Sequence, residues 1–168
     1  MDGEGKFRQF VAARQDALLR TACLLSGDWA SAEDLVQTTL TKTYLAWGRI
    51  TDHEAADAYV RRVMVNTATS LWRRKWRDER PTEVLPEVVQ PDFTDRMALS
   101  QDLWAEVRKL PARQRAVLVL RFHDDLSEAA TAAALGVSVG TVKSQTSRAL
   151  GALRGRVEPV DAKGSVTR

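Results

Sequence analysis

The sequence predicts an all-α protein made of two small helical domains joined by a flexible linker. Apolar residues recur at helical spacing through most of the 168 residues, and no segment alternates apolar and polar residues as a strand would. Pro81, Pro86 and Pro91 interrupt this pattern and favour an extended tether. We therefore expect a first domain over 5–79, a linker over 80–95, a second domain over 96–156 and a disordered tail over 157–168.

The composition is ordinary for a folded protein, with 44% hydrophobic and 28% charged residues. The net charge of +3 is too small to indicate nucleic-acid binding unless the charges are clustered. A single cysteine, Cys23, excludes an intrachain disulfide and a cysteine-based zinc site. No stretch approaches the roughly 20 apolar residues of a membrane span and the N-terminus is polar, so we expect a cytoplasmic protein without membrane contact.

The first two helices of the first domain are predicted from their apolar stripes and from their ends. One stripe begins at Phe7 and closes at Ser26-Gly27-Asp28. The second helix is expected to begin at Ser31, which would form a capping-box-like start with Asp34, and to run to about Trp47. Its predicted core stripe comprises Val36, Leu40, Tyr44 and Trp47.

A third helix, expected from Asp57 to about Asp78 after a short connection over Gly48–Ala56, has two unlike faces. The apolar face carries Val60, Val63, Met64, Thr67 and Leu71. The opposite face carries Arg62, Asn66, Thr69, Ser70, Arg73 and Arg77. Such a face suits nucleic acid, and a surface helix whose arginines only solubilise the protein is the alternative. Trp72 and Trp76 flank this face and either stack on bases or pack in a core or interface.

The second domain is expected to begin near Arg96 with a helix whose apolar residues are Leu99, Leu103, Val107 and Leu110. Pro111 opens the next helix, whose core is expected to hold Val117, Leu118, Leu120 and Phe122. A helix over Leu126–Leu135, a turn at Gly136 and a final helix from Ser138 to about Arg154 complete the domain.

The segment from Leu126 to Leu153 predicts a helix-turn-helix, in which the second helix enters the DNA major groove. Gly136 can take the positive φ that ends the first helix, Ser138 can cap the second, and Val137 and Val142 can bury into the hinge. The outward side chains can contact base edges and phosphates: Ser138, Thr141, Lys143, Ser144, Gln145, Ser147 and Arg148. An ordinary helical hairpin with a solvated polar face is the alternative.

Four segments stand in a fixed order along the chain: SAEDLVQ at 31–37, AYVRRVMVNTA at 58–68, LP at 110–111 with VLVLRF at 117–122, and LGVSVGTVKS at 135–144. Together they closely resemble the extracytoplasmic-function (ECF) sigma factors of bacterial RNA polymerase, in the sigma-70 family, and in particular the SigE-like subgroup. The resemblance covers about residues 5 to 156.

This resemblance implies that the first domain is sigma region 2, which binds the β′ clamp of core RNA polymerase and the minus-ten promoter element. It implies that the second is sigma region 4, which binds the β flap and the minus-thirty-five element. The implied polymerase contacts are Asp34, Leu35, Gln37, Thr38 and Lys42. The implied minus-ten contacts are Thr51, Asp52, His53, Arg62, Asn66, Thr69, Ser70, Arg73, Arg74 and Arg77. A loop at about Arg49–Ala56 would hold a flipped base, while Asn66 would hold the opened duplex.

The sequence departs from the family pattern at two positions of the helix-turn-helix. Ser127 is followed by Ala130 where many relatives carry a glutamate, so half of a capping box is missing. Gln145 replaces the usual arginine, and its amide is better matched to adenine than to guanine. We therefore expect an altered minus-thirty-five preference.

No catalytic, metal or cofactor site is expected, because His53 and His123 are the only histidines and no His, Asp and Glu grouping has the spacing of metal ligands. Two other functions remain open at this point. One is a stand-alone helix-turn-helix regulator with an N-terminal sensing or dimerising domain, and the other is a helical interaction protein whose basic helix binds acidic partners. The sequence does not tell whether an anti-sigma factor binds the chain.

Overall fold

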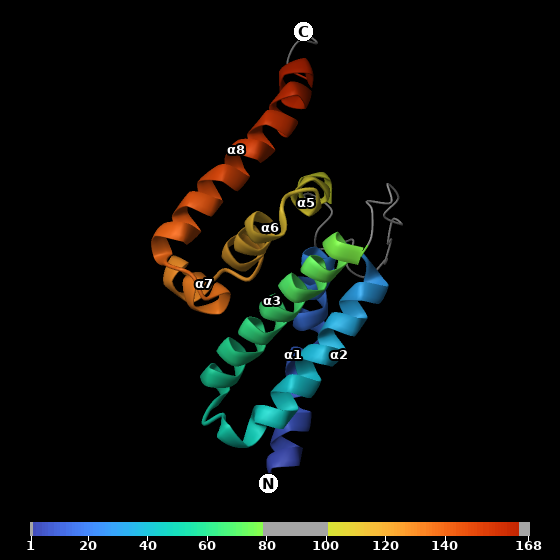
Figure 1. Cartoon of the computed structure of the whole chain (residues 1–168), viewed down its shortest axis with the longest axis vertical. Helices are drawn as coiled ribbons and strands as arrows, with labels where there is room; N and C mark the ends of the chain where they lie inside the picture. The colour runs from blue at the N-terminus through green and yellow to red at the C-terminus, as the bar shows by residue number, and fades with distance from the viewer. Residues whose placement is uncertain (1, 79–100, 165–168) are drawn as a thin grey trace. The chain divides into compact units, whose positions relative to one another are not determined.

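The computed structural model describes the backbone of residues 2–78 and 101–164, and the side chains of residues 2–71 and 103–155. The described secondary structure is entirely helical and forms two compact units (Figure 1), which confirms the all-α, two-domain prediction. The linker predicted at 80–95 lies outside the described residues, as do Arg96 and Leu99.

The first domain consists of α1 (Gly3–Ser26), α2 (Trp29–Ala46), the short 3₁₀ turn η1 (Trp47–Arg49) and α3 (His53–Asp78). The three long helices lie side by side in Figure 1, and α2 makes most of its contacts with both α1 and α3. Since two partners cover α2 from different sides, its buried arc is wider than a single apolar stripe.

Aspartates define the starts of these helices. The carboxylate of Asp2 accepts a hydrogen bond from the backbone of Gly5 at 2.8 Å, so α1 begins four residues before the predicted Phe7. Asp28 caps α2 by accepting from the backbone of Ser31 at 2.7 Å. The predicted cap at Ser31 is therefore wrong, because Asp28 lies three residues earlier and binds the same early amide that a capping side chain satisfies.

The core of the first domain includes the fully buried Leu35, Val60 and Met64. Two predicted core residues are wrong: Tyr44 is 49% exposed and Leu71 is 37% exposed. Further residues that line the core between α2 and its partners are Val36, Thr39, Leu40, Thr43, Ala46, Val65, Thr67 and Ala68. The buried threonines offset their polarity locally, because each of Thr39 and Thr43 donates its hydroxyl hydrogen to a carbonyl one turn earlier.

The second domain consists of α5 (Gln101–Arg108), α6 (Ala112–Leu118), the π-helical turn η3 (Val119–His123), α7 (Glu128–Leu135) and α8 (Val139–Gly164). The predicted disordered tail is wrong over 157–164, because α8 continues through Pro159 to Gly164. Extending a formed helix requires no new nucleation, which offsets part of the cost of Pro159, a residue that removes one backbone donor and crowds the carbonyl four residues earlier. Residues 165–168 lie outside the described chain.

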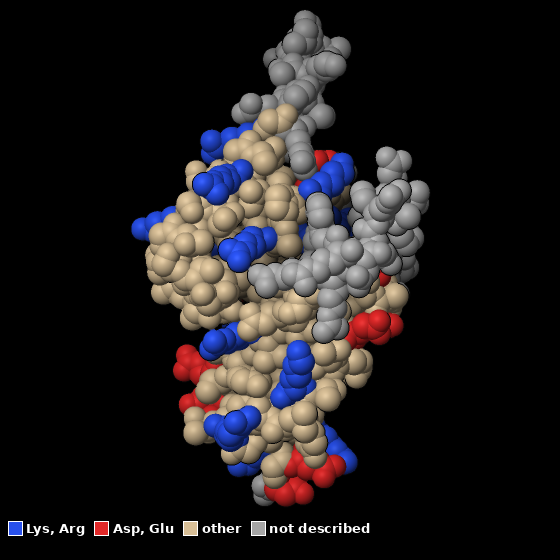
Figure 2. Space-filling view, viewed as in Figure 1, with Lys and Arg blue, Asp and Glu red and all other residues tan. Residues whose placement is uncertain are grey.

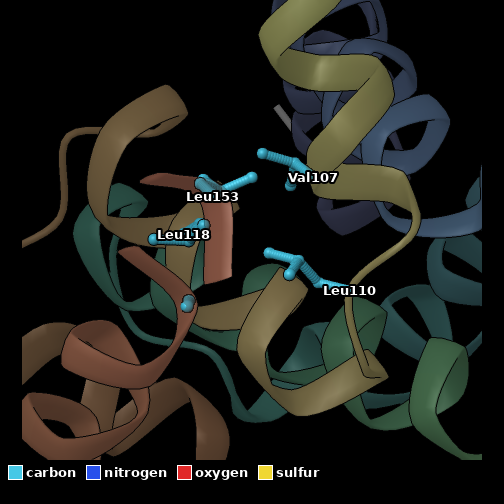
Figure 3. Close-up of a cluster of buried hydrophobic side chains, with 5 residues drawn as sticks. Val107, Leu110, Leu118 and Leu153 are labelled. Atoms are coloured by element: carbon cyan, nitrogen blue, oxygen red, sulfur yellow. The ribbon is translucent and has the colours of Figure 1, made fainter. Parts of the chain in front are cut away.

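A buried apolar cluster joins α5, α6 and α8. Val107, Leu110, Leu118 and Leu153 point toward one another (Figure 3), and Ala149 belongs to the same buried cluster. Phe122, predicted in the core, is instead 51% exposed, and Leu103 on the apolar stripe of α5 is 43% exposed. Phe122 is displaced because η3 winds more widely than an α-helix, with the backbone of Asp124 donating to the carbonyl of Val119 five residues earlier at 3.0 Å.

Arg115 is buried within this domain and donates from Nη1 to the backbone carbonyl of Arg108 at 2.9 Å. This bond satisfies a carbonyl at the C-terminal end of α5, where helix carbonyls lack partners within the helix. Burial lowers the pKa of the Arg115 guanidinium to about 10, so the side chain remains cationic at neutral pH. The interaction therefore fixes the end of α5 to α6.

Candidate nucleic-acid interface

The corner between α7 and α8 has the geometry of a helix-turn-helix. Gly136 adopts a positive φ of 66°, and the backbone of Val137 donates to the carbonyl of Ala132 at 3.1 Å. Ser138 caps α8, because its Oγ accepts from the backbone of Thr141 at 3.1 Å. Val142 is fully buried behind the turn. The predicted roles of Gly136, Ser138 and Val142 are all confirmed.

The start of α7 is capped by one side chain. The Oγ of Ser127 accepts from the backbone of Ala130 at 3.0 Å, while Ala130 has no side chain that could reach back to the Ser127 amide. Glu128, the first residue of α7, places a carboxylate at the positive end of the helix. The predicted half-complete capping box is therefore present in the structure, and Ser127 supplies its one capping hydrogen bond.

The outward face of α8 presents the predicted DNA-contacting side chains. Ser138, Lys143, Ser144, Ser147 and Arg148 are exposed, whereas Thr141 and Gln145 are partly buried. The hydroxyls of Ser138 and Thr141 bind each other at 2.9 Å, so both lie at the start of the helix, where a recognition helix meets base edges. Their use as readers is untested by these contacts and stays a prediction.

The polar face of α3 is present along its described length. Arg62, Asn66 and Ser70 are exposed, and Thr69 is partly buried with its hydroxyl donating to the carbonyl of Val65 at 2.8 Å. The side chains of Trp72, Arg73, Arg74, Trp76 and Arg77 lie outside the described set, although all five positions belong to α3. The described part of this face therefore brings together one guanidinium, one amide and two hydroxyls.

The connection before α3 is shorter than predicted. Since η1 occupies Trp47–Arg49 and α3 begins at His53, not at Asp57, only Ile50, Thr51 and Asp52 lie between helices. Asp52 explains the early start, because its Oδ1 accepts from the backbone of Ala55 at 2.7 Å. Thr51, Asp52 and His53 are all exposed, as a loop that holds a base requires, but Asp52 already serves as a helix cap.

The predicted polymerase strip on α2 is mostly accessible. Asp34, Gln37, Thr38 and Lys42 are exposed, whereas Leu35 is fully buried and supplies core packing, not a surface contact. The ammonium of Lys42 donates to Thr67 of α3 at 3.2 Å, which places Lys42 on the edge of α2 nearest α3.

Sequence reasoning did not include Leu45 in the exposed strip of α2, although its side chain is 77% exposed. It follows Thr38 and Thr41 by seven and four residues, so it continues the same exposed strip. The position of Leu45 within the helical period is therefore the signal that would have identified it. Phe7 packs its ring 5.0 Å from that of Tyr44, which explains how the neighbouring exposed aromatic is held.

Two other kinds of site are absent from the residues described. No group of three or more His, Cys, Asp or Glu side chains within residues 2–78 and 101–164 could hold a metal ion. No helix in the same ranges is long and apolar enough to cross a membrane.

Both halves of the chain match models of known protein regions. Residues 10–78 match Sigma-70 region 2, and residues 100–153 match Sigma-70, region 4. The first match contains α3 and its polar face, and the second contains the corner between α7 and α8. The two surfaces identified from geometry therefore fall one in each region.

Relatives of known type match nearly the whole chain. The RNA polymerase sigma-E factor of Streptomyces avermitilis is 47% identical over 156 residues, which cover 93% of this chain and 87% of the relative. The sigma-E factor of Streptomyces coelicolor is 48% identical over 149 residues, covering 89% and 84%.

Solved structures show the same fold. The sigma factor RpoE from Bartonella quintana, in complex with the anti-sigma factor NepR, superposes with a TM-score of 0.74 and 27% identity, covering 97% of this chain and 99% of that one. CnrH in complex with the cytosolic domain of CnrY has a TM-score of 0.64 and 24% identity, covering 93% and 90%, a likeness of fold alone.

Proposed function

Because this chain belongs to the extracytoplasmic-function sigma factors of the sigma-70 family, we propose that it contacts a promoter with both domains while it is bound to core RNA polymerase. As a member of this family, the protein is a sigma factor that directs the polymerase to promoters. We propose which of its side chains contact the promoter. The observation that carries this proposal is that each sigma region presents an exposed polar face with cations, Arg62 on α3 in the first region and Lys143 with Arg148 on α8 in the second.

On α8, the proposed minus-thirty-five contacts are of two kinds: side chains that bind base edges and cations that bind phosphates. Lys143 and Arg148 are exposed cations that can bind phosphates or guanine edges. Gln145 offers both a donor and an acceptor, the pattern that pairs with adenine. The capped start at Ser138 directs the free amides of α8 toward DNA.

On α3, the proposed minus-ten contacts hold a melted strand. Flipping a base out of the duplex costs a few kcal/mol, and hydrogen bonds and stacking in the pocket must offset this free energy. Thr51 and His53 at the start of α3 and Asn66 on its exposed face supply such groups, and Arg62 supplies charge for the backbone.

We propose that core RNA polymerase binds the α2 strip through Asp34, Gln37, Thr38 and Lys42. The β flap of the polymerase is the proposed partner of the second domain. An anti-sigma factor is bound to RpoE in its structure, and a protein of that kind is a further proposed partner of this chain. We place the protein in the cytoplasm with its polymerase and assign it no catalytic activity of its own, since the polymerase makes the phosphodiester bonds.

Promoter-specific transcription tests the function. Purified full-length protein is added to bacterial core RNA polymerase on a library of genomic fragments, and we expect start sites that depend on the protein. Absence of stimulation on every fragment, together with tight duplex binding by the protein alone, would instead establish the stand-alone regulator. That alternative is not favoured, because it leaves the region 2 match unexplained.

Asn66→Ala tests the minus-ten assignment separately. The residue lies on the exposed face of α3, so the fold is retained and polymerase binding should be unchanged. We expect weaker permanganate reactivity of thymines in the promoter bubble, with Gln15→Ala, which removes an exposed amide on α1 outside the proposed contacts, as the control. Unchanged thymine reactivity in the Asn66 variant would remove this residue from the site.

A further inference from the structure

The helix-turn-helix contains a single carboxylate, and it lies beside a predicted DNA-contacting lysine. From Leu126 to Val157 the sequence has four Lys or Arg residues but only one acidic residue, Glu128. Its Oε2 is 3.9 Å from the Nζ of Lys143, with side chains 38% and 66% exposed. On the face shown in Figure 2, the second domain carries mainly basic side chains, whereas most acidic ones belong to the first domain. Glu128 is therefore the one acidic side chain within the helix-turn-helix, which the acidic pair Asp124-Asp125 precedes.

Helix capping explains only part of this position. Glu128 is the first residue of α7, where a carboxylate interacts favourably with the positive end of the helix. That benefit is independent of the direction in which the side chain extends. The proximity to Lys143, fifteen residues later on α8, is a separate observation that places the carboxylate next to the face used for DNA.

A carboxylate at this point affects the two kinds of DNA contact differently. A phosphate bound by Lys143 would bring a second negative charge close to Glu128, and like charges repel. A guanine edge offers Lys143 the neutral acceptors O6 and N7, so the ammonium can bind it while keeping its partner. Phosphate contacts carry no sequence information, whereas base-edge contacts do.

We propose that Glu128 is a specificity-determining residue that acts through Lys143. It opposes phosphate contacts by this lysine, lowers the affinity for DNA of any sequence, and leaves base-edge contacts favoured. The inference rests on the proposed function, because it requires α8 to contact DNA.

The test compares holoenzymes that carry full-length variants, on a promoter duplex and on a scrambled duplex of the same length, over a range of salt concentrations. We expect Glu128→Gln to raise the affinity for the scrambled duplex roughly two- to fivefold, the effect of removing one exposed ion-pair partner. The salt dependence of log K should steepen by about 0.9, as one additional phosphate contact does. The gain on the promoter duplex should be smaller.

Two controls separate this mechanism from a general charge effect. Glu106→Gln makes the same charge change in the same domain, beside Lys109 and not Lys143, and should leave both affinities unchanged. Lys143→Met added to Glu128→Gln should abolish the gain. Misfolding cannot imitate the expected result, because an unfolded domain binds more weakly, and Glu128→Asp, which keeps the charge, should not show the gain.

The outcomes distinguish the inference from the function beneath it. Equal gains on both duplexes, an equal gain from Glu106→Gln, or no gain from Glu128→Gln would each overturn the role of Glu128. If Lys143→Met alone leaves promoter binding unchanged, the assignment of α8 to DNA fails as well.

Discussion

Gly136 allows the energetics of the helix-turn-helix to be tested with one methyl group. Its φ of 66° lies in the left-handed region, and a Cβ built there meets nothing within 4 Å, so Gly136→Ala adds backbone strain without a steric clash. The left-handed conformation costs an L-residue roughly 1–2 kcal/mol. Alanine also lowers the conformational entropy of the unfolded chain, which stabilises the folded state by about 0.4–1 kcal/mol. We expect a net destabilisation of about 1 kcal/mol.

Gly151→Ala is the matched control. Gly151 lies within α8, and a Cβ there also meets nothing within 4 Å, but the backbone is helical. Alanine is favoured over glycine inside a helix by about 1 kcal/mol, so this variant should be more stable than the parent. The same chemical change is therefore expected to have opposite signs at the two positions.

Hydrogen exchange followed by mass spectrometry on the full-length protein measures both effects, with peptides of α1–α3 as an internal reference. A loss of 1 kcal/mol should speed exchange of protected α7 and α8 amides about fivefold, and Gly151→Ala should slow it by a similar factor. If Gly136→Ala leaves exchange unchanged or slows it, the positive φ does not control this corner and the reasoning is refuted.

Three further changes test other parts of the fold. Val142→Ala empties a fully buried position behind the turn and should cost about 2 kcal/mol, seen as faster exchange throughout α8; a cost confined to the site would contradict this packing role. Asp125 has a φ of 54°, so Asp125→Gly should raise the melting temperature of the second domain by relieving about 1 kcal/mol of strain, whereas a lower melting temperature would rule out strain there. Arg14 binds both carboxylate oxygens of Asp57, at 2.7 and 2.8 Å, which raises the pKa of its guanidinium. Because the pair is partly exposed, Arg14→Ala should cost at most about 1 kcal/mol in urea unfolding and less at high salt; a cost independent of salt would contradict an electrostatic origin.

The features that sequence reasoning predicted correctly depend on a few neighbouring residues. A glycine followed two residues later by a serine determines both the end of α7 and the start of α8, since one supplies the positive φ and the other the cap. Of the two valines in the first turn of α8, Val142 is fully buried and Val139 is 39% exposed, in agreement with the predicted hinge position of Val142. Local chemistry therefore sufficed for the helix-turn-helix.

The buried face of α2 was harder to predict because it depends on tertiary contacts. Two neighbouring helices bury Leu35 and Thr43, which both lie on one side of the stripe expected from the apolar pattern, and Tyr44 on the other edge of the stripe is left half exposed beside Phe7. A threonine that donates to the carbonyl one turn earlier is compatible with a core, although its residue type indicates a surface. Predicted contact residues such as Leu35 can therefore be buried.

The helix starts show competition between nearby caps. Asp28 and Ser31 can each cap a helix, and so can Asp52 ahead of α3, but only one residue occupies the capping position at each start. The sequence alone does not rank them. The choice matters at α3, because a start at His53 shortens the loop available to hold a flipped base and commits one Asp52 oxygen to the helix.

The small number of exposed cations on the proposed DNA face of α8 argues that the second domain does not suffice alone. Over the first three turns of α8, Lys143 and Arg148 are the basic residues, and each phosphate contact contributes only about 0.9 to the salt dependence of log K. Glu128 reduces the contribution of Lys143 further under the inference above. The α8 face becomes selective when the polymerase holds it together with the second proposed DNA face of the chain, since each face then binds at a high effective concentration once the other is bound. Discrimination would therefore depend on the spacing of the two promoter elements as much as on either sequence.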